Sequence, residues 1–152
     1  MKIGKYFTLH EMERSDTAKR LGISNKADEA SINNAKELCR NLLDPLREFW
    51  GPIYISSWYR SEALNQAIGG ATGSHHMTGN AVDIDLDGID ENGNKEIFHL
   101  IRLKFDFHTL IWEFGDNNKP DWVHISWFPN NNPKRVLRAI KENGKTKYEP
   151  YK

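Results

Sequence analysis

Two short stretches of this sequence alternate aliphatic residues with polar ones, and this pattern restricts the fold more than any other feature. The stretches span residues 80–86 and 122–127. Their aliphatic positions are Val82, Ile84, Leu86, Val123 and Ile125. Because successive side chains of a strand point to opposite faces, each stretch is expected to bury its aliphatic side. The other side then presents Asp83 on one strand and His124 on the other, so we expect two half-buried strands with a polar front.

The longest helical pattern lies in residues 28–49. Apolar side chains recur there at the spacing of one helix face, and Gly51 followed by Pro52 is expected to end the helix. Pro45 lies inside this segment, so we expect it to bend or split the helix. The other predicted helices span residues 15–21, 61–68 and 96–104.

Short apolar runs bounded by turn residues predict the remaining strands, which span residues 52–57, 109–114, 135–141 and 145–148. The last two flank Asn143-Gly144, a strong hairpin signal. Strands and helices are interspersed without regular βαβ repeats. The sequence therefore predicts a single α+β domain over residues 1–152, with a small, mostly antiparallel sheet and helices packed on one side.

Charge and composition exclude several classes of protein. The chain has 152 residues, with 21 Lys and Arg against 21 Asp and Glu, which gives no case for nucleic acid or an anionic membrane as a partner. No apolar run approaches the roughly 20 residues of a membrane span. Residues 1–16 lack the apolar core of a secretion signal. We therefore expect synthesis in the cytoplasm, and we expect a monomer.

The single cysteine, Cys39, restricts the chemistry further. One cysteine excludes an internal disulfide and a Cys-rich zinc site. Because Cys39 lies beside the apolar stripe of the long helix, we expect a small buried hydrophobic residue and not a nucleophile.

His76, Asp83 and His124 are the candidate ligands of a metal ion. His76 lies in a glycine-rich loop just before the strand of Asp83, and Gly79 allows the backbone to turn tightly between them. Two imidazoles and one carboxylate suit Zn²⁺ with its fourth position left for water, the catalytic arrangement. His75 is an alternative ligand at this position. A structural or solvent-exposed role is expected for the other histidines, His10, His99 and His108.

Calcium is a competing possibility. Asp83-x-Asp85-x-Asp87-Gly88 matches the first half of an EF-hand loop. Position twelve of that loop would be Asn94 and not the bidentate glutamate, and the flanking residues indicate a strand. We therefore expect a solvated rim of carboxylates, formed by Asp85, Asp87, Asp90 and Glu91.

These residues resemble a known family. The chain resembles the zinc D-alanyl-D-alanine carboxypeptidases, which include vancomycin-resistance D,D-dipeptidases and phage endolysins, in the motif Ser74-x-His76-x-x-Gly79-x-Ala81-x-Asp83 followed by Trp122-x-His124. The upstream segment 57–61 is similar to the family's Ser-Gly-Tyr-Arg-Ser, with Trp58 in place of the usual glycine. Segments 6–9 and 43–47 resemble the phage and prophage branch. The resemblance implies the small α+β fold shared with the hedgehog signalling domain.

The resemblance also implies roles for individual residues. The family's zinc ligands fall on the three candidate ligands above, and its substrate-steadying arginine falls on Arg60. Its general base, an acidic residue three positions before the last histidine, falls on Asp121, which must then lie in the turn before the strand. Glu113 is the rival base, because it ends a neighbouring strand among aromatic residues that would raise its pKa. Ser74 and Tyr59 are the candidate substrate-binding residues, and further candidates for the pocket walls are Trp58, Trp122 and Trp127.

The implied function is zinc-dependent hydrolysis of peptidoglycan stem peptides, of the D-Ala–D-Ala carboxypeptidase or L-Ala–D-Glu endopeptidase type. The alternative is an inactive binding module of the same fold, since the hedgehog domain keeps its metal and acts as a protein ligand. A wall enzyme without an export signal fits a phage or prophage protein. We therefore expect it to reach the cell wall after phage-type release or as part of a virion.

Overall fold

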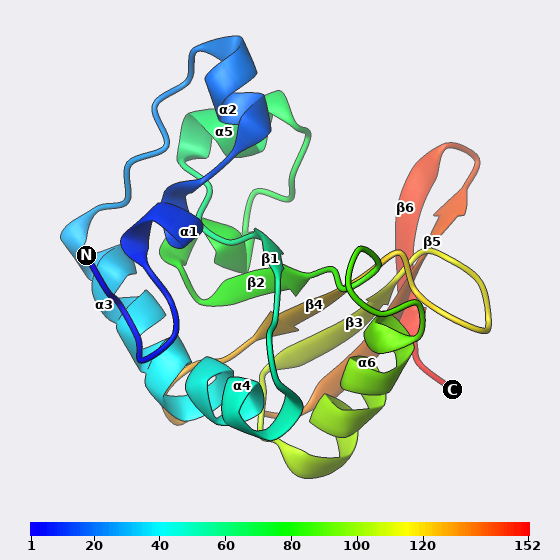
Figure 1. Cartoon of the computed structure of the whole chain (residues 1–152). Helices are drawn as coiled ribbons and strands as arrows, with labels where there is room; N and C mark the ends of the chain where they lie inside the picture. Colours follow the sequence, from blue (N-terminus) through cyan, green and yellow to red (C-terminus); the bar gives the residue numbers. More distant parts are fainter.

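The computed structural model describes all residues from 1 to 152, and they form one mixed sheet with helices around it (Figure 1). The sheet has six strands in the order β1-β2-β4-β3-β5-β6. The strands are β1 (Ile55–Ser57), β2 (Ala81–Ile84), β3 (Thr109–Glu113), β4 (Trp122–Ser126), β5 (Arg135–Glu142) and β6 (Lys145–Pro150). The predicted α+β class with a mostly antiparallel sheet is confirmed.

All neighbouring strands are antiparallel except β3 and β5, which run parallel. The segment between them includes β4, which pairs with β3 on its other side. The predicted hairpin of β5 and β6 is confirmed. Asn143 and Gly144 both have positive φ, at 54° and 77°, as a two-residue hairpin turn of the mirror-image type requires.

The longer helices cover one face of the sheet (Figure 1). They are α3 (Glu29–Leu38), α4 (Asp44–Trp50) and α6 (Gly93–Lys104). Their apolar sides meet the aliphatic face of the sheet in a single core that includes Leu38, Leu46, Phe98, Val82 and Ile125. This arrangement leaves the opposite face of the central strands free to carry polar side chains.

The predicted long helix is split at Pro45 by a π-helical turn, η1 (Cys39–Leu43). The main-chain N–H of Asp44 donates to the carbonyl of Cys39 across this wider turn. A proline lacks a donor and its ring crowds the carbonyl four residues back, so one wider turn before it relieves the clash without ending the helix. Cys39 is fully buried as expected, and burial raises the pKa of its thiol.

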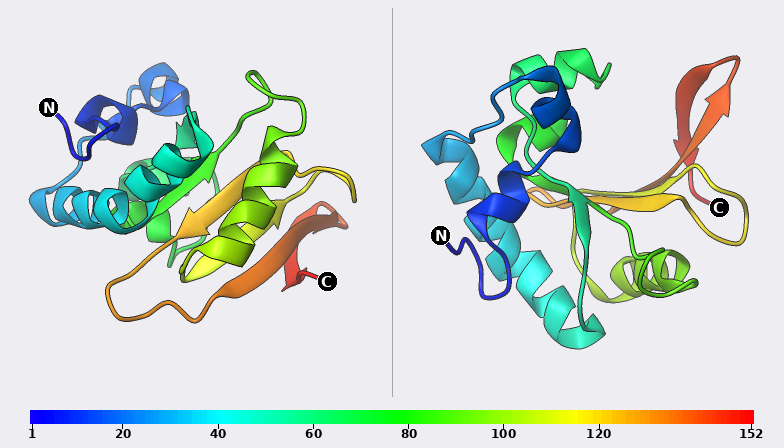
Figure 2. Two further views of the ribbon diagram at one scale, coloured as in Figure 1. Left: turned by 60° about the horizontal axis from the view of Figure 1, so that its bottom comes forward. Right: turned by 45° about the horizontal axis from the view of Figure 1, so that its top comes forward.

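The shorter helices lie toward the β1 edge and the other side of the sheet (Figure 2, right). They are α1 (Leu9–Glu13), α2 (Asp16–Leu21) and α5 (Glu62–Ala67), with the 3₁₀ helix η2 (His75–Thr78). Helix α1 was not predicted, although Thr8 and Glu11 form a capping box at its start. The expected strand over residues 52–57 is shortened to β1. None of the helices combines the length and apolar character of a membrane-spanning segment.

Candidate metal centre

Asp83 and His124 lie opposite each other on the adjacent strands β2 and β4. Both side chains leave the sheet on the face that the long helices do not cover, as the alternation predicts. His124 Nδ1 lies 3.1 Å from Asp83 Oδ1, and His76 Nε2 lies 3.3 Å from the same oxygen. One ligand atom from each of the three residues lies within 4.8 Å of the other two. The structure therefore brings the three candidate ligands together.

These separations and the donor set fit a zinc ion. Bonds of about 2.0–2.1 Å in a tetrahedron place neighbouring ligand atoms about 3.3 Å apart. The two distances to Asp83 Oδ1 match this value. The two histidines are largely buried, with 3% of the His76 side chain and 12% of the His124 side chain exposed. Two imidazole nitrogens and one carboxylate oxygen could hold the ion and leave a fourth position open.

The loop that carries His76 is held in place by local contacts. Ser74 caps η2, and its hydroxyl accepts a hydrogen bond from the main-chain N–H of His76. Gly79 ends η2 with φ 79°, and a Cβ there would lie 2.5 Å from the carbonyl oxygen of Ser31 on α3. Only glycine fits this close approach without displacing the helix. The loop is thus pressed against α3.

Trp58 fixes the ring of His76. Its carbonyl oxygen lies 2.6 Å from His76 Nδ1, and because a carbonyl only accepts, Nδ1 carries the proton. Nε2 is then the unprotonated nitrogen, and it faces Asp83. The Trp58 indole N–H also donates to the carbonyl of Gly79. Sequence reasoning placed Trp58 among the pocket walls, but it is fully buried; a main-chain carbonyl leaves no sequence signal of its role.

Arg60 lies at the β1 side of the ligands. Its main-chain N–H donates to the carbonyl of His76, and its guanidinium lies 3.5 Å from Asp83 Oδ2. Asp83 therefore presents Oδ1 to the two histidines and Oδ2 to the arginine. With 17% of its side chain exposed, Arg60 remains accessible to a ligand on this face.

The charge states of Asp83 and His124 favour metal binding. Burial alone would raise the pKa of Asp83, but the adjacent His76 and His124 hold it well below its usual range. Burial lowers the pKa of His124, and this outweighs the opposing effect of Asp83. At neutral pH, Asp83 is thus ionised and His124 is neutral, which are the forms that donate electron pairs to a metal ion.

Of the two candidate bases, Glu113 lies on the same sheet face as the ligands. It is the last residue of β3 and pairs with Trp122 of β4, two positions from His124. Glu113 is only 7% exposed. Burial raises its pKa to about 8, and Asp83 adds to that effect while Arg60 opposes it.

Asp121 occupies the turn directly before β4, as its candidacy required, but its side chain is exposed. Its main-chain N–H donates to the carbonyl of Glu113 and thereby extends the ladder between β3 and β4. Its carboxylate is not part of the cluster that His76, Asp83 and His124 form. The structure does not bring the Asp121 carboxylate to the three ligands.

The remaining candidate residues line neighbouring surfaces. Ser74 lines a pocket of about 460 Å³ with His75, His108 and Phe128. In that pocket the rings of His75 and His108 meet edge to face at 4.9 Å, so His75 belongs to an aromatic cluster and not to the ligand group. Tyr59 is buried and borders a second pocket, of about 230 Å³, together with Arg60.

The expected rim of carboxylates after β2 is held by Asn94, at the start of α6. Its amide N–H groups donate to Asp85 and Asp87, and its amide oxygen accepts from the main-chain N–H of Leu86. Asn94 is completely buried. The neutral Asn94 side chain thus donates hydrogen bonds to Asp85 and Asp87, two of the carboxylates that a calcium ion would require as ligands.

The chain matches a known protein family. Residues 5–126 match the model of the family described as peptidase M15. The matched range contains all three ligands, Arg60 and both candidate bases. No curated protein matches the chain. The match confirms the resemblance to the zinc D-alanyl-D-alanine carboxypeptidases.

Proposed function

Because the chain belongs to the peptidase M15 family and is a metallopeptidase of that family, we propose that it is a zinc enzyme that hydrolyses peptidoglycan stem peptides. The observation that carries this proposal is the convergence of His76, Asp83 and His124 on one point of the open sheet face. Arg60 and Glu113 flank that point, which is more than a purely structural metal site requires.

Each flanking residue has a role in amide hydrolysis. His76, Asp83 and His124 would hold the Zn²⁺ ion, which would supply a Lewis acid to acidify water and polarise an amide carbonyl. Arg60 donates hydrogen bonds to the substrate's carbonyl oxygen and stabilises the negative charge that develops on it. Glu113 accepts a proton from the attacking water and delivers it to the leaving amine.

Glu113 is the better base on geometric grounds. Its carboxyl lies on the ligand face, and no hydrogen bond from the chain contributes to its raised pKa, so the group is free to exchange a proton with a substrate. A positive metal ion nearby would lower its pKa from about 8 toward the working range of a general base. Asp121 lacks this placement.

We also propose where the protein originates and where it acts. The likeness of segments 6–9 and 43–47 to the phage and prophage branch supports a phage or prophage protein. Such a protein would act on the cell wall after phage-type release or within a virion. Lysis of cells with exposed walls by added protein tests this extension, and intact walls after long incubation would oppose it.

The decisive experiment is digestion of purified muropeptides followed by mass spectrometry. We expect loss of alanine or of a peptide fragment with zinc present, and no reaction after chelation. The mass of the product distinguishes cleavage of D-Ala–D-Ala from cleavage of L-Ala–D-Glu. Tight wall binding with no mass change would instead favour an inactive binding module.

A further inference from the structure

A row of paired residues connects the catalytic face to the C-terminal hairpin. Trp122 of β4 pairs with Glu113 of β3, Glu113 pairs with Ala139 of β5, and Ala139 pairs with Tyr148 of β6. Directly paired residues of a sheet project from the same face. Tyr148 therefore projects from the face that carries Glu113 and the three metal ligands.

Only Ala139 separates Tyr148 from Glu113. Ala139 is completely buried, so longer side chains from neighbouring segments cover its small methyl group. With strands about 4.8 Å apart, the main chains of Tyr148 and Glu113 are about 10 Å apart. Tyr148 keeps 53% of its surface exposed, so its ring is available to a bound molecule.

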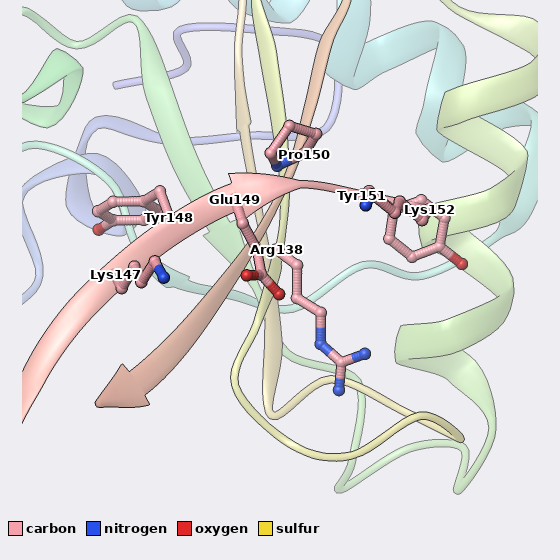
Figure 3. Close-up of a pocket in the computed structure, with 7 residues that line it drawn as sticks. All are labelled: Arg138, Lys147, Tyr148, Glu149, Pro150, Tyr151 and Lys152. Atoms are coloured by element: carbon pink, nitrogen blue, oxygen red, sulfur yellow. The ribbon is translucent and has the colours of Figure 1, made fainter. Parts of the chain in front are cut away.

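The hairpin is also bent toward the catalytic side. Its tip rises on the same side of the sheet as α2 and α5, in both views that show the sheet edge-on (Figures 1 and 2, right). In the close-up of the pocket along β6, Tyr148 leaves the strand on the opposite side from Arg138 and Glu149 (Figure 3).

The charged groups of the catalytic face affect the pKa of the Tyr148 hydroxyl. Burial raises the pKa of the Tyr148 hydroxyl, the carboxylates of Glu113 and Asp83 raise it further, and Arg60 opposes them. The hydroxyl thus stays protonated and remains a hydrogen-bond donor. Arg60 offers hydrogen-bond donors on the same face at the β1 side of the sheet, and Tyr148 offers one at the β6 side.

We propose that the Tyr148 hydroxyl donates a hydrogen bond to a carbonyl group of the peptide substrate. The β5–β6 hairpin is then one wall of the substrate-binding face, and the peptide crosses the strands from Arg60 to Tyr148. The family match ends at residue 126, so this wall is formed by a segment outside the matched region. The inference rests on the proposed peptidase function.

The test measures binding separately from activity. The probe is the stem pentapeptide L-Ala-γ-D-Glu-L-Lys-D-Ala-D-Ala, titrated by calorimetry into zinc-loaded protein carrying Glu113→Gln, which prevents turnover. The same titration is repeated after adding Tyr148→Phe or Tyr151→Phe. Tyr151 is the matched control, because it follows β6 but stacks on Trp112 on the opposite face of the sheet.

Loss of one neutral hydrogen bond is expected to weaken pentapeptide binding by about 3- to 10-fold with Tyr148→Phe, while Tyr151→Phe leaves it unchanged. Zinc content and the urea midpoint should be unchanged by Tyr148→Phe. Equal binding with and without Tyr148→Phe overturns the inference, as does an equal loss with Tyr151→Phe or a loss of zinc.

The failure of this inference is distinguishable from the failure of the proposed function. If wild-type protein cleaves stem peptides and Tyr148→Phe changes neither binding nor KM, only the role of Tyr148 is refuted. If the wild-type protein neither cleaves muropeptides nor binds the pentapeptide, both are refuted.

Discussion

His76 Nδ1 lies 2.6 Å from the carbonyl oxygen of Trp58, and this contact determines which nitrogen of His76 faces the other ligands. The same tryptophan holds the loop of His76 through its indole N–H, which donates to Gly79. Contacts of this kind around a ligand are worth roughly tenfold or more in metal affinity. Trp58 therefore links the stability of the core to the affinity of the site.

Trp58→Phe removes the indole donor and part of a fully buried ring. We expect it to lower the free energy of unfolding by about 1–3 kcal/mol and to weaken zinc binding, because the loop of His76 loses its brace. Urea denaturation and competition with a chromophoric chelator measure the two effects. Unchanged zinc affinity in a folded variant would mean that the main-chain carbonyl alone orients the ring.

Glu113→Gln and Asp121→Asn are a matched pair for the general base. Both replace a carboxylate by an amide of the same shape, Glu113 at the end of β3 and Asp121 in the turn before β4. Glu113→Gln is expected to lower kcat by about 10²- to 10⁴-fold with zinc retained, whereas Asp121→Asn should leave kcat within a few-fold of wild type. The reverse pattern, with activity lost only at Asp121, would reassign the base.

The stability of the metal-free protein should reveal the buried Glu113. Its pKa is raised to about 8 in the folded state, whereas the unfolded carboxyl titrates near its ordinary value. Between these values the folded state binds more protons, so stability falls as pH rises, by at most about 1.4 kcal/mol per pH unit for one group. Glu113→Gln removes this contribution of residue 113 to the pH dependence of stability.

We therefore expect wild type to lose stability relative to Glu113→Gln as the pH is raised from about 5 to about 8. Chemical denaturation in the presence of a chelator, at several pH values, gives the difference directly. Other groups that titrate here, including His124, are common to both proteins and cancel. A difference that stays constant, or that grows in favour of wild type, would refute the raised pKa.

Asn94 is expected to be essential for the loop that follows β2. Asn94→Ala leaves the main-chain N–H of Leu86 and the carbonyl of Asp121 without their present partners. The expected loss is about 2–4 kcal/mol in the free energy of unfolding. Asn92→Ala is the control, because Asn92 is exposed and its side chain makes no capping hydrogen bond. Equal urea midpoints for the two variants would contradict this account.

Sequence patterns predicted the parts of the site that depend on local order. Alternation along each strand put Asp83 and His124 on the polar face, and the hairpin turn at Asn143 follows from its dipeptide. The choice between Glu113 and Asp121 could not be made in this way. It depends on the register of β3 against β4, which pairs Glu113 with Trp122 and is set by contacts between distant segments.

Two further features were beyond sequence reasoning for the same reason. The parallel pairing of β3 with β5 brings Ala139 beside Glu113 and so brings Tyr148 to the catalytic face. The π-helical turn before Pro45 depends on how the surrounding core tolerates a wider turn. Neither leaves a periodic pattern in the chain.

The central claim is that His76, Asp83 and His124 hold one zinc ion. Metal analysis by mass spectrometry, combined with X-ray absorption at the zinc edge, measures this most directly. We predict one zinc per chain, with two imidazoles and oxygen ligands at about 2.0–2.1 Å, and loss of the metal in Asp83→Ala. Calcium in place of zinc, or zinc without imidazole ligands, would contradict the account.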